Sequence, residues 1–132
     1  MILVSSAIVA ILLREPDFEP LLDLVCTTDE LGVGVPTLVE TGIVLSARIG
    51  HDARGMLSRF VAEARIATIP FGDAHWSAAI DAWLRYGKGR HAAALNYGDC
   101  LAYATARVAG KPLLCVGADF AQTDLEITGG VV

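Results

Sequence analysis

The sequence predicts an α/β fold, namely one three-layer α/β/α domain over residues 1–132 with a central, mostly parallel sheet. Two observations predict this fold class. Short apolar runs alternate with longer segments of helical periodicity, and crossover connections through helices favour parallel strands. The composition, with 54% hydrophobic and 19% charged residues in 132, provides one hydrophobic core and excludes extensive disorder.

The first half of the chain alternates between these two patterns. The apolar run 1–4 predicts a strand, and two serines that favour helix capping lead from it into a helix over 7–13. A proline separates this helix from another over 17–26, whose apolar residues share one face. A second strand follows at 32–35. The next proline starts a helix that reaches residue 50.

The second half continues the alternation. Residues 52–65 form an amphipathic pattern typical of a helix, and the apolar run 66–70 predicts a third strand. Helices are expected over 73–85 and over 99–108, the latter ended by a glycine. The last expected strands cover 112–116 and 125–128.

Charge is unevenly distributed along the chain. Residues 1–40 contain seven acids and one arginine, whereas residues 41–111 contain nine basic residues and five acids. The densest basic segment is 85–91, and its candidate contacts to a phosphate backbone are Lys88, Arg90 and His91. A solvated surface loop is the alternative interpretation, because clusters of charge often only face water.

Other features bear on where the protein works. No uncharged apolar run approaches the roughly 20 residues of a membrane span. The start lacks the basic segment of a signal peptide, so a cytoplasmic protein is expected. The three cysteines have neither zinc-ligand nor disulfide-framework spacing, and we expect core thiols in a reducing compartment.

Three acidic residues are candidate metal ligands. Glu40 shares a predicted helix face with apolar residues, Asp99 opens a predicted helix, and Asp119 lies just after a predicted strand. Structural interpretations stay open, because an acid near a helix N-terminus interacts favourably with the helix dipole and aspartate is common at caps and turns. Asp124 has the same ambiguity.

The three acids gain significance as a group. In a parallel α/β fold, functional residues gather outside the carboxyl ends of the strands, where we expect all three. Carboxylates placed together repel unless they share a cation, and oxygen ligands of this kind select Mg²⁺ or Mn²⁺. Such an ion would bind a phosphodiester and activate water for in-line attack.

Several motifs resemble those of one family, the VapC-type toxins of the PIN-domain ribonucleases. The resemblance spans nearly the whole chain and is most specific in the stretches 86–91 and 96–100. Its motifs are Ser5-Ser6-Ala7, Glu15-Pro16, Tyr86-Gly87-Lys88-Gly89-Arg90-His91, Leu95-Asn96-Tyr97-Gly98-Asp99-Cys100, Gly117-Ala118-Asp119-Phe120 and Thr123-Asp124.

This resemblance implies a Mg²⁺- or Mn²⁺-dependent endoribonuclease, the toxin of a type II toxin–antitoxin system. The family's acidic cluster corresponds to Glu40, Asp99 and Asp119 as catalytic residues and metal ligands, and Ser6 matches the hydroxyl residue beside the cluster. The implied substrate is a structured RNA such as tRNA. The implied partners are a cognate VapB-type antitoxin and a second copy of the chain in a homodimer.

One departure from the family pattern affects the expected activity. The family has an aspartate after the first strand, where this chain reads Leu3-Val4-Ser5-Ser6-Ala7, so the first acidic ligand is absent. We therefore expect weakened metal binding. Two alternatives stay open: a catalytically silent PIN domain that binds the antitoxin, and a different Mg²⁺-dependent enzyme such as a phosphatase or receiver-like domain.

Overall fold

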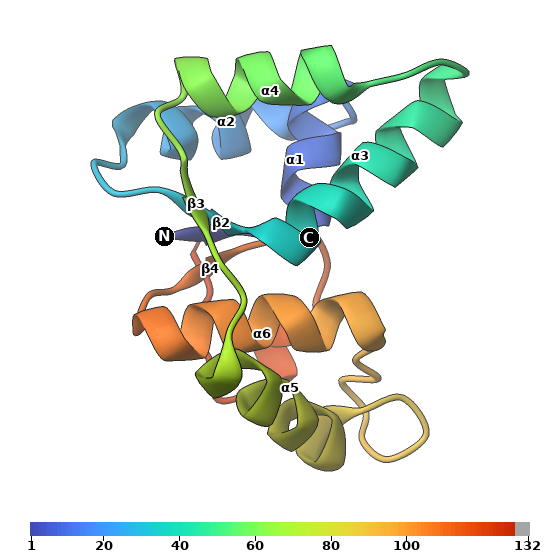
Figure 1. Ribbon diagram of the computed structural model, residues 1–132, viewed down its shortest axis with the longest axis vertical. Coiled ribbons are helices and arrows are strands. Elements are labelled where there is room, and N and C mark those ends of the chain that lie inside the picture. The colour runs from blue at the N-terminus through green and yellow to red at the C-terminus, as the bar shows by residue number, and fades with distance from the viewer. Residues whose placement is uncertain (129–132) are drawn as a thin grey trace.

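A computed structural model of the chain describes residues 1–128 and shows a four-stranded sheet between two layers of helices (Figure 1). Its strand order is β3-β2-β1-β4, and every neighbouring pair is parallel. The strands are β1 (Ile2–Leu3), β2 (Gly32–Gly34), β3 (Ala67–Ile69) and β4 (Leu113–Leu114). The helices are α1 (Ser5–Leu12), α2 (Phe18–Thr27), α3 (Val35–Ile49), α4 (Arg54–Glu63), α5 (Asp73–Tyr86) and α6 (Tyr97–Ala109), with a 3₁₀ turn η1 (Phe120–Gln122). The predicted three-layer class is confirmed.

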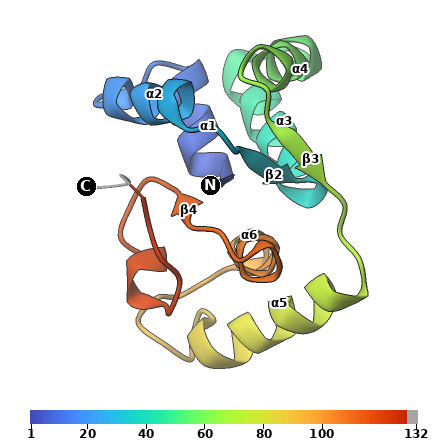
Figure 2. The same ribbon diagram turned by 90° about the vertical axis from the view of Figure 1, so that its left-hand side faces the viewer.

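The two helix layers cover separate cores on opposite faces of the sheet. Helices α1 to α4 lie on one face, and α5 and α6 lie on the other (Figure 2). Side chains alternate along the first strand, so Met1 and Leu3 enter the first core while Ile2 and Val4 enter the second. The near-continuous apolar run at the start of the chain is therefore what a strand buried on both faces requires.

Several predicted boundaries were wrong by a few residues. Helix α1 begins at Ser5 and not at residue 7, and the strand predicted over 112–116 covers only Leu113–Leu114. Helix α6 begins at Tyr97, two residues before the predicted start, because Asn96 caps it. The last predicted strand, 125–128, is only an isolated bridge between Leu113 and Ile127. Strand β4 has two residues, so the pairing with this segment ends after the two hydrogen bonds that flank the bridge.

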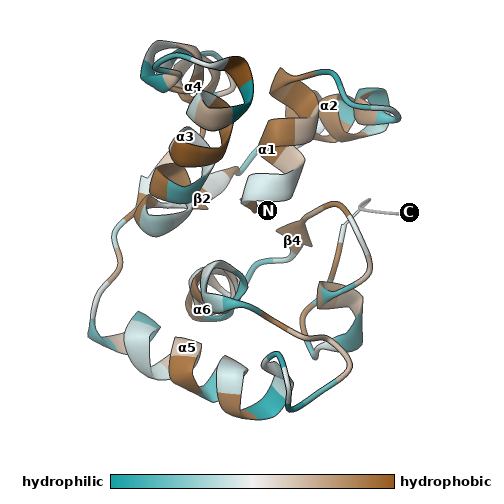
Figure 3. Cartoon of the chain, turned by 90° about the vertical axis from the view of Figure 1, so that its right-hand side faces the viewer, coloured by the Kyte–Doolittle hydropathy of each residue, from teal (hydrophilic) through white to brown (hydrophobic). Residues whose placement is uncertain are grey.

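Surface exposure corrects one further expectation and marks two apolar faces. Cys100 and Cys115 are buried, but Cys26 is exposed and is not a core thiol. Exposed apolar side chains occur on α3 and α5, helices whose ribbons carry brown apolar segments in Figure 3. The most exposed on α3 is Ile43, at 65%, and on α5 Trp76, at 56%. Within residues 1–128, no helix has the length and apolar character of a membrane span.

Candidate functional site

Glu40 lies where helices α3 and α6 meet. Helix α3 follows β2 directly, which brings its second turn to the carboxyl edge of the sheet. The half-buried Glu40 carboxylate rests against the backbone of Gly98, where a Cβ atom would collide with it. Only glycine at position 98 allows this approach, so the Asn-Tyr-Gly-Asp motif contributes to the placement of Glu40.

Asp99 has both a structural and an electrostatic role. Its Oδ2 accepts the Asn96 backbone N–H at 3.0 Å, and its own N–H donates to Asn96 Oδ1 at 2.9 Å, which completes a capping box at the start of α6. Burial raises the pKa of Asp99, the Asn96 hydrogen bond opposes this, and the charges of Glu40 and Asp119 raise it further. The three predicted acids therefore share one electrostatic environment.

Asp119 lies in the turn that follows β4. The turn passes through Gly117, whose φ of +96° favours glycine, and Asp119 is exposed just before η1. The next residue, Phe120, is only 5% exposed and packs in the second core. The buried ring anchors the turn beside an exposed carboxylate.

Ser6 and Val4 complete the surroundings of the acids. Ser6 Oγ accepts the backbone N–H of Val116 at 3.0 Å and thereby joins the start of α1 to the turn that carries Asp119. Val4 is 4% exposed and belongs to the same buried cluster as Cys100 and Phe120, the residues next to Asp99 and Asp119. An apolar side chain thus occupies the end of β1, where the family pattern has an acid.

The donors suit a hard divalent cation, but their arrangement is incomplete. Carboxylate oxygens are the ligands that Mg²⁺ and Mn²⁺ prefer. Within residues 1–128, however, no three His, Cys, Asp or Glu side chains are grouped so that they could hold a metal ion.

The Cys115 thiol is influenced by the same acids. Burial, with the charges of Asp119 and Asp99, raises the pKa of the Cys115 thiol to about 11, which keeps this thiol protonated.

The basic loop between α5 and α6 is tied to the end of α5. Arg90 Nε donates to the carbonyl of Leu84 at 3.1 Å, and its guanidinium lies 4.8 Å from the centre of the Trp83 ring. His91 Nδ1 accepts the Ala93 N–H at 3.0 Å. Among residues 1–128, Lys88 forms no ion pair and its side chain is exposed. Two of the three candidate phosphate contacts therefore also stabilise the loop.

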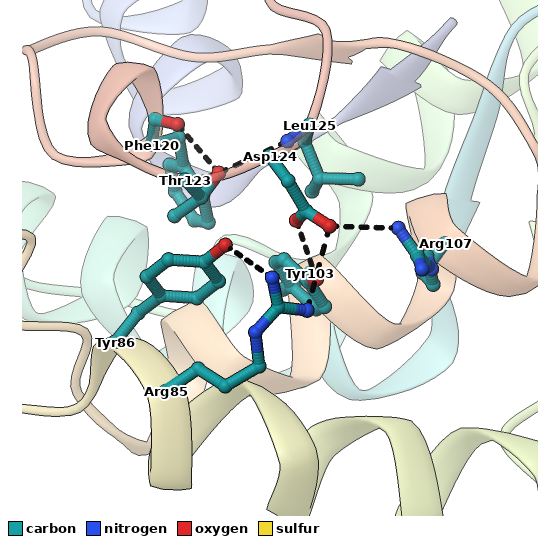
Figure 4. A network of polar contacts seen from close by, with 8 residues as sticks. All are labelled: Arg85, Tyr86, Tyr103, Arg107, Phe120, Thr123, Asp124 and Leu125. Carbon is teal, nitrogen blue, oxygen red and sulfur yellow. Dashed lines mark hydrogen bonds and ion pairs between the residues drawn. The ribbon is translucent and has the colours of Figure 1, made fainter.

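A polar network that was not predicted from the sequence surrounds Asp124 (Figure 4). Asp124 accepts hydrogen bonds from Tyr103 Oη at 2.7 Å and from Arg107 Nη1 at 2.9 Å, both on α6. Arg85 Nη1, from α5, approaches it at 3.4 Å. A signal was present, because Tyr103 and Arg107 follow Asp99 at intervals of four residues and so share a helix face.

Comparison with known proteins places this geometry in a family. The model of the PIN domain family matches residues 1–126. The chain belongs to the PIN-domain family. It is 45% identical over 132 residues to ribonuclease VapC36 of Mycobacterium tuberculosis, covering 99% of this chain and 95% of that protein. It is 41% identical over 125 residues to a ribonuclease VapC of Mycolicibacterium smegmatis, covering 95% and 97%.

Solved structures show the same PIN-domain fold. One is VapC20 of M. tuberculosis, described as a sarcin-ricin loop cleaving toxin, with a TM-score of 0.76 and 16% identity over 94% of this chain and 95% of that one. Another is a toxin–antitoxin complex from Klebsiella pneumoniae, with a TM-score of 0.66 and 15% identity over 99% and 94%. At these identities the likeness concerns the fold.

Proposed function

We propose that this PIN domain is the toxin of a toxin–antitoxin pair and an endoribonuclease whose catalytic acids are Glu40, Asp99 and Asp119. One observation carries the proposal: the charges of Glu40 and Asp119 both act on the pKa of Asp99. This electrostatic coupling supports a shared role for three acids from distant segments near the carboxyl edge of a parallel sheet, where such folds bind ligands. Full-length relatives named VapC ribonucleases support the same function.

The three carboxylates would hold Mg²⁺ or Mn²⁺. When bound, such an ion offers Lewis-acid stabilisation of phosphate charge and a lower pKa for water. The protein contributes orientation. The Asn96 N–H engages Oδ2 of Asp99 and so fixes the direction of its other oxygen, while Gly98 lets Glu40 approach. These contacts set the acids before a substrate arrives.

The proposed substrate is a structured RNA such as a tRNA. Lys88 supplies an exposed charge for the phosphate backbone, with Arg90 and His91 beside it in the same loop. The Ser6 hydroxyl uses a lone pair for Val116, which leaves its proton available to donate to a phosphate oxygen. RNA-binding proteins that recognise sequence mostly target loops with splayed bases. The structural neighbour VapC20 is described as a sarcin-ricin loop cleaving toxin.

The proposed partners are a VapB-type antitoxin and a second copy of the chain. A groove of about 930 Å³ between α3 and α4 offers an apolar helix a binding surface, and Val39 and Ile43 line both this groove and the hollow beside Glu40. A helix seated there would lie next to Glu40. The exposed face of α5, with Trp76 and Trp83, is available for contact between copies.

The test is a cleavage assay on a panel of structured RNAs. Cleavage is expected with Mg²⁺, none with EDTA, and at least a hundredfold less with Glu40→Ala. Glu63→Ala, which removes an exposed carboxylate from α4, serves as the matched control and should cleave like the parent. Cleavage that survives EDTA or the loss of Glu40 would overturn the assignment.

A second candidate function rests on Val4. A buried valine at the end of β1, together with the incomplete ligand group, favours a catalytically silent PIN domain that binds the antitoxin without cutting RNA. A cleavage assay at increasing concentrations of Mg²⁺ or Mn²⁺ distinguishes the two functions. A silent domain binds the antitoxin and cleaves no RNA at any Mg²⁺ concentration, whereas a weakened nuclease regains cleavage as Mg²⁺ or Mn²⁺ rises.

A further inference from the structure

The turn that carries Asp119 is held internally by short-range hydrogen bonds. In its 3₁₀ turn, the Gln122 N–H donates to the Asp119 carbonyl at 3.3 Å and the Thr123 N–H donates to the Phe120 carbonyl at 3.0 Å. Thr123 Oγ1 also donates to the Phe120 carbonyl at 2.6 Å and accepts the Leu125 N–H at 3.3 Å. Such short 3₁₀ segments have poor hydrogen-bond geometry. All of these bonds lie within the turn, so the position of Asp119 relative to the other acids depends on contacts outside it.

Electrostatics also works against this position. The negative charges of Asp119 and Glu40 both raise the pKa of Asp99, so the three acids interact unfavourably. Like charges without a cation between them repel. Since Asp119 is exposed, repulsion would favour its movement away from the other acids unless contacts outside the turn opposed it.

Three contacts hold the turn to the rest of the fold. At its start, Ser6 Oγ accepts the Val116 N–H at 3.0 Å. Within it, the Phe120 ring is buried in the second core. At its end, Asp124 binds α6 and α5 through the network of Figure 4, in which Arg85 Nη2 also donates to Tyr86 Oη at 2.8 Å.

The Asp124 network is partly shielded from solvent. The Asp124 side chain is 32% exposed, so its ion pairs are less screened than those of fully exposed residues. Asp99, Tyr103 and Arg107 lie along one face of α6, and the acid of the candidate site stands one helical turn before the tyrosine that binds Asp124. The same helix face therefore orients both Asp99 and the anchor of the turn that carries Asp119.

We propose that Asp124 is a positioning residue that holds the Asp119 turn against α6 and so keeps Asp119 at the acidic site. This inference rests on the proposed function for its catalytic meaning, but the fastening itself is a property of the fold. Both carboxylate oxygens of Asp124 accept hydrogen bonds, from Tyr103, Arg107 and Arg85, and these bonds direct its side chain toward α6 and α5.

The first test measures amide hydrogen exchange by NMR in Asp124→Asn and Tyr103→Phe. Exchange of the Gln122 and Thr123 amides is expected to become about tenfold faster, while amides of β1 and the middle of α6 change little. Glu30→Gln, which removes the Lys111–Glu30 pair of 2.7 Å at the opposite end of β4, is the matched control and should leave the turn unchanged. Unchanged exchange in Asp124→Asn overturns the inference.

A second test separates positioning from plain support of the fold. In a Val4→Asp background, Asp124→Asn should raise the Mg²⁺ concentration for half-maximal RNA cleavage about tenfold and leave the KM for RNA unchanged. A looser turn with an unaltered Mg²⁺ requirement and kcat would make Asp124 structural only. If the Val4→Asp parent cleaves no RNA, the proposed function fails, while the exchange measurement still decides whether Asp124 fastens the turn.

Discussion

Replacement of Val4 by aspartate tests the role of the missing acid. Val4 is 4% exposed at the end of β1, in the cluster that includes the neighbours of Asp99 and Asp119. Loss of its burial costs about 1.5 kcal/mol. Burial beside other acids favours the neutral carboxyl form, and burying such a polar group costs about as much again. Without a divalent ion, Val4→Asp should therefore lower the free energy of unfolding by about 3 kcal/mol. A domain of typical stability, about 5–15 kcal/mol, remains folded after such a loss.

A divalent ion should reverse most of this loss. If the new carboxylate completes the ligand group, Mg²⁺ at about 100 times its dissociation constant stabilises the folded state by about 2.7 kcal/mol. For a chain of this length, the expected melting temperature falls by about 12 °C in EDTA and recovers by about 10 °C in Mg²⁺. The unmodified chain should shift much less between the two conditions.

Differential scanning calorimetry with EDTA or Mg²⁺ measures both changes. Val4→Asn is the matched control, because asparagine has nearly the same shape and a similar burial cost but no charge for the ion. RNA cleavage at saturating Mg²⁺ should rise by at least a hundredfold in Val4→Asp and not in Val4→Asn. The reasoning is refuted if Mg²⁺ stabilises the two variants equally, or if cleavage is the same in the chain with and without the aspartate.

Three further predictions concern the acids and the apolar groove. Gly98→Ala should not lower the melting temperature, because alanine favours the helix and the flexible Glu40 carboxylate can move away from the new Cβ atom. RNA cleavage should nevertheless fall at least tenfold, because Glu40 is displaced. Unaltered cleavage would contradict a role for the contact between Gly98 and Glu40. Asp99→Asn should stabilise the metal-free protein at pH 7, because the pKa of Asp99 is raised in the folded state and its ionisation above that pKa lowers the free energy of unfolding. Urea titrations at several pH values measure this. The extra stability of the variant should disappear as the pH falls below the ordinary aspartate pKa of 3.8. Ile43 is 65% exposed, so Ile43→Asp should change the free energy of unfolding by no more than about 0.5 kcal/mol. Calorimetry should nevertheless show antitoxin binding at least tenfold weaker, whereas the control Val108→Asp on α6 should bind normally. Equal binding by the two variants would show that the groove is not part of the interface.

The sequence alone determined the fold class and most of its elements. Alternation of apolar runs with amphipathic segments is a local property, and the strands at the start of the chain and at 32–34 follow from it directly. The predicted start of α6 was late because the capping asparagine, and not the aspartate three residues on, ends the preceding loop. The bridge at Ile127 was overestimated as a strand because pairing length depends on the partner, and β4 supplies only two residues.

The candidate site divides in the same way. The motifs, and positions at the ends of strands or the starts of helices, made Glu40, Asp99 and Asp119 candidates from the sequence, and their role stays a prediction. Only the tertiary structure decided that Gly98 makes room for Glu40 and that Asp124 binds Tyr103 and Arg107. The physical reason is range: periodicity and capping act over a few residues, whereas these contacts join segments that become neighbours only when both cores have packed.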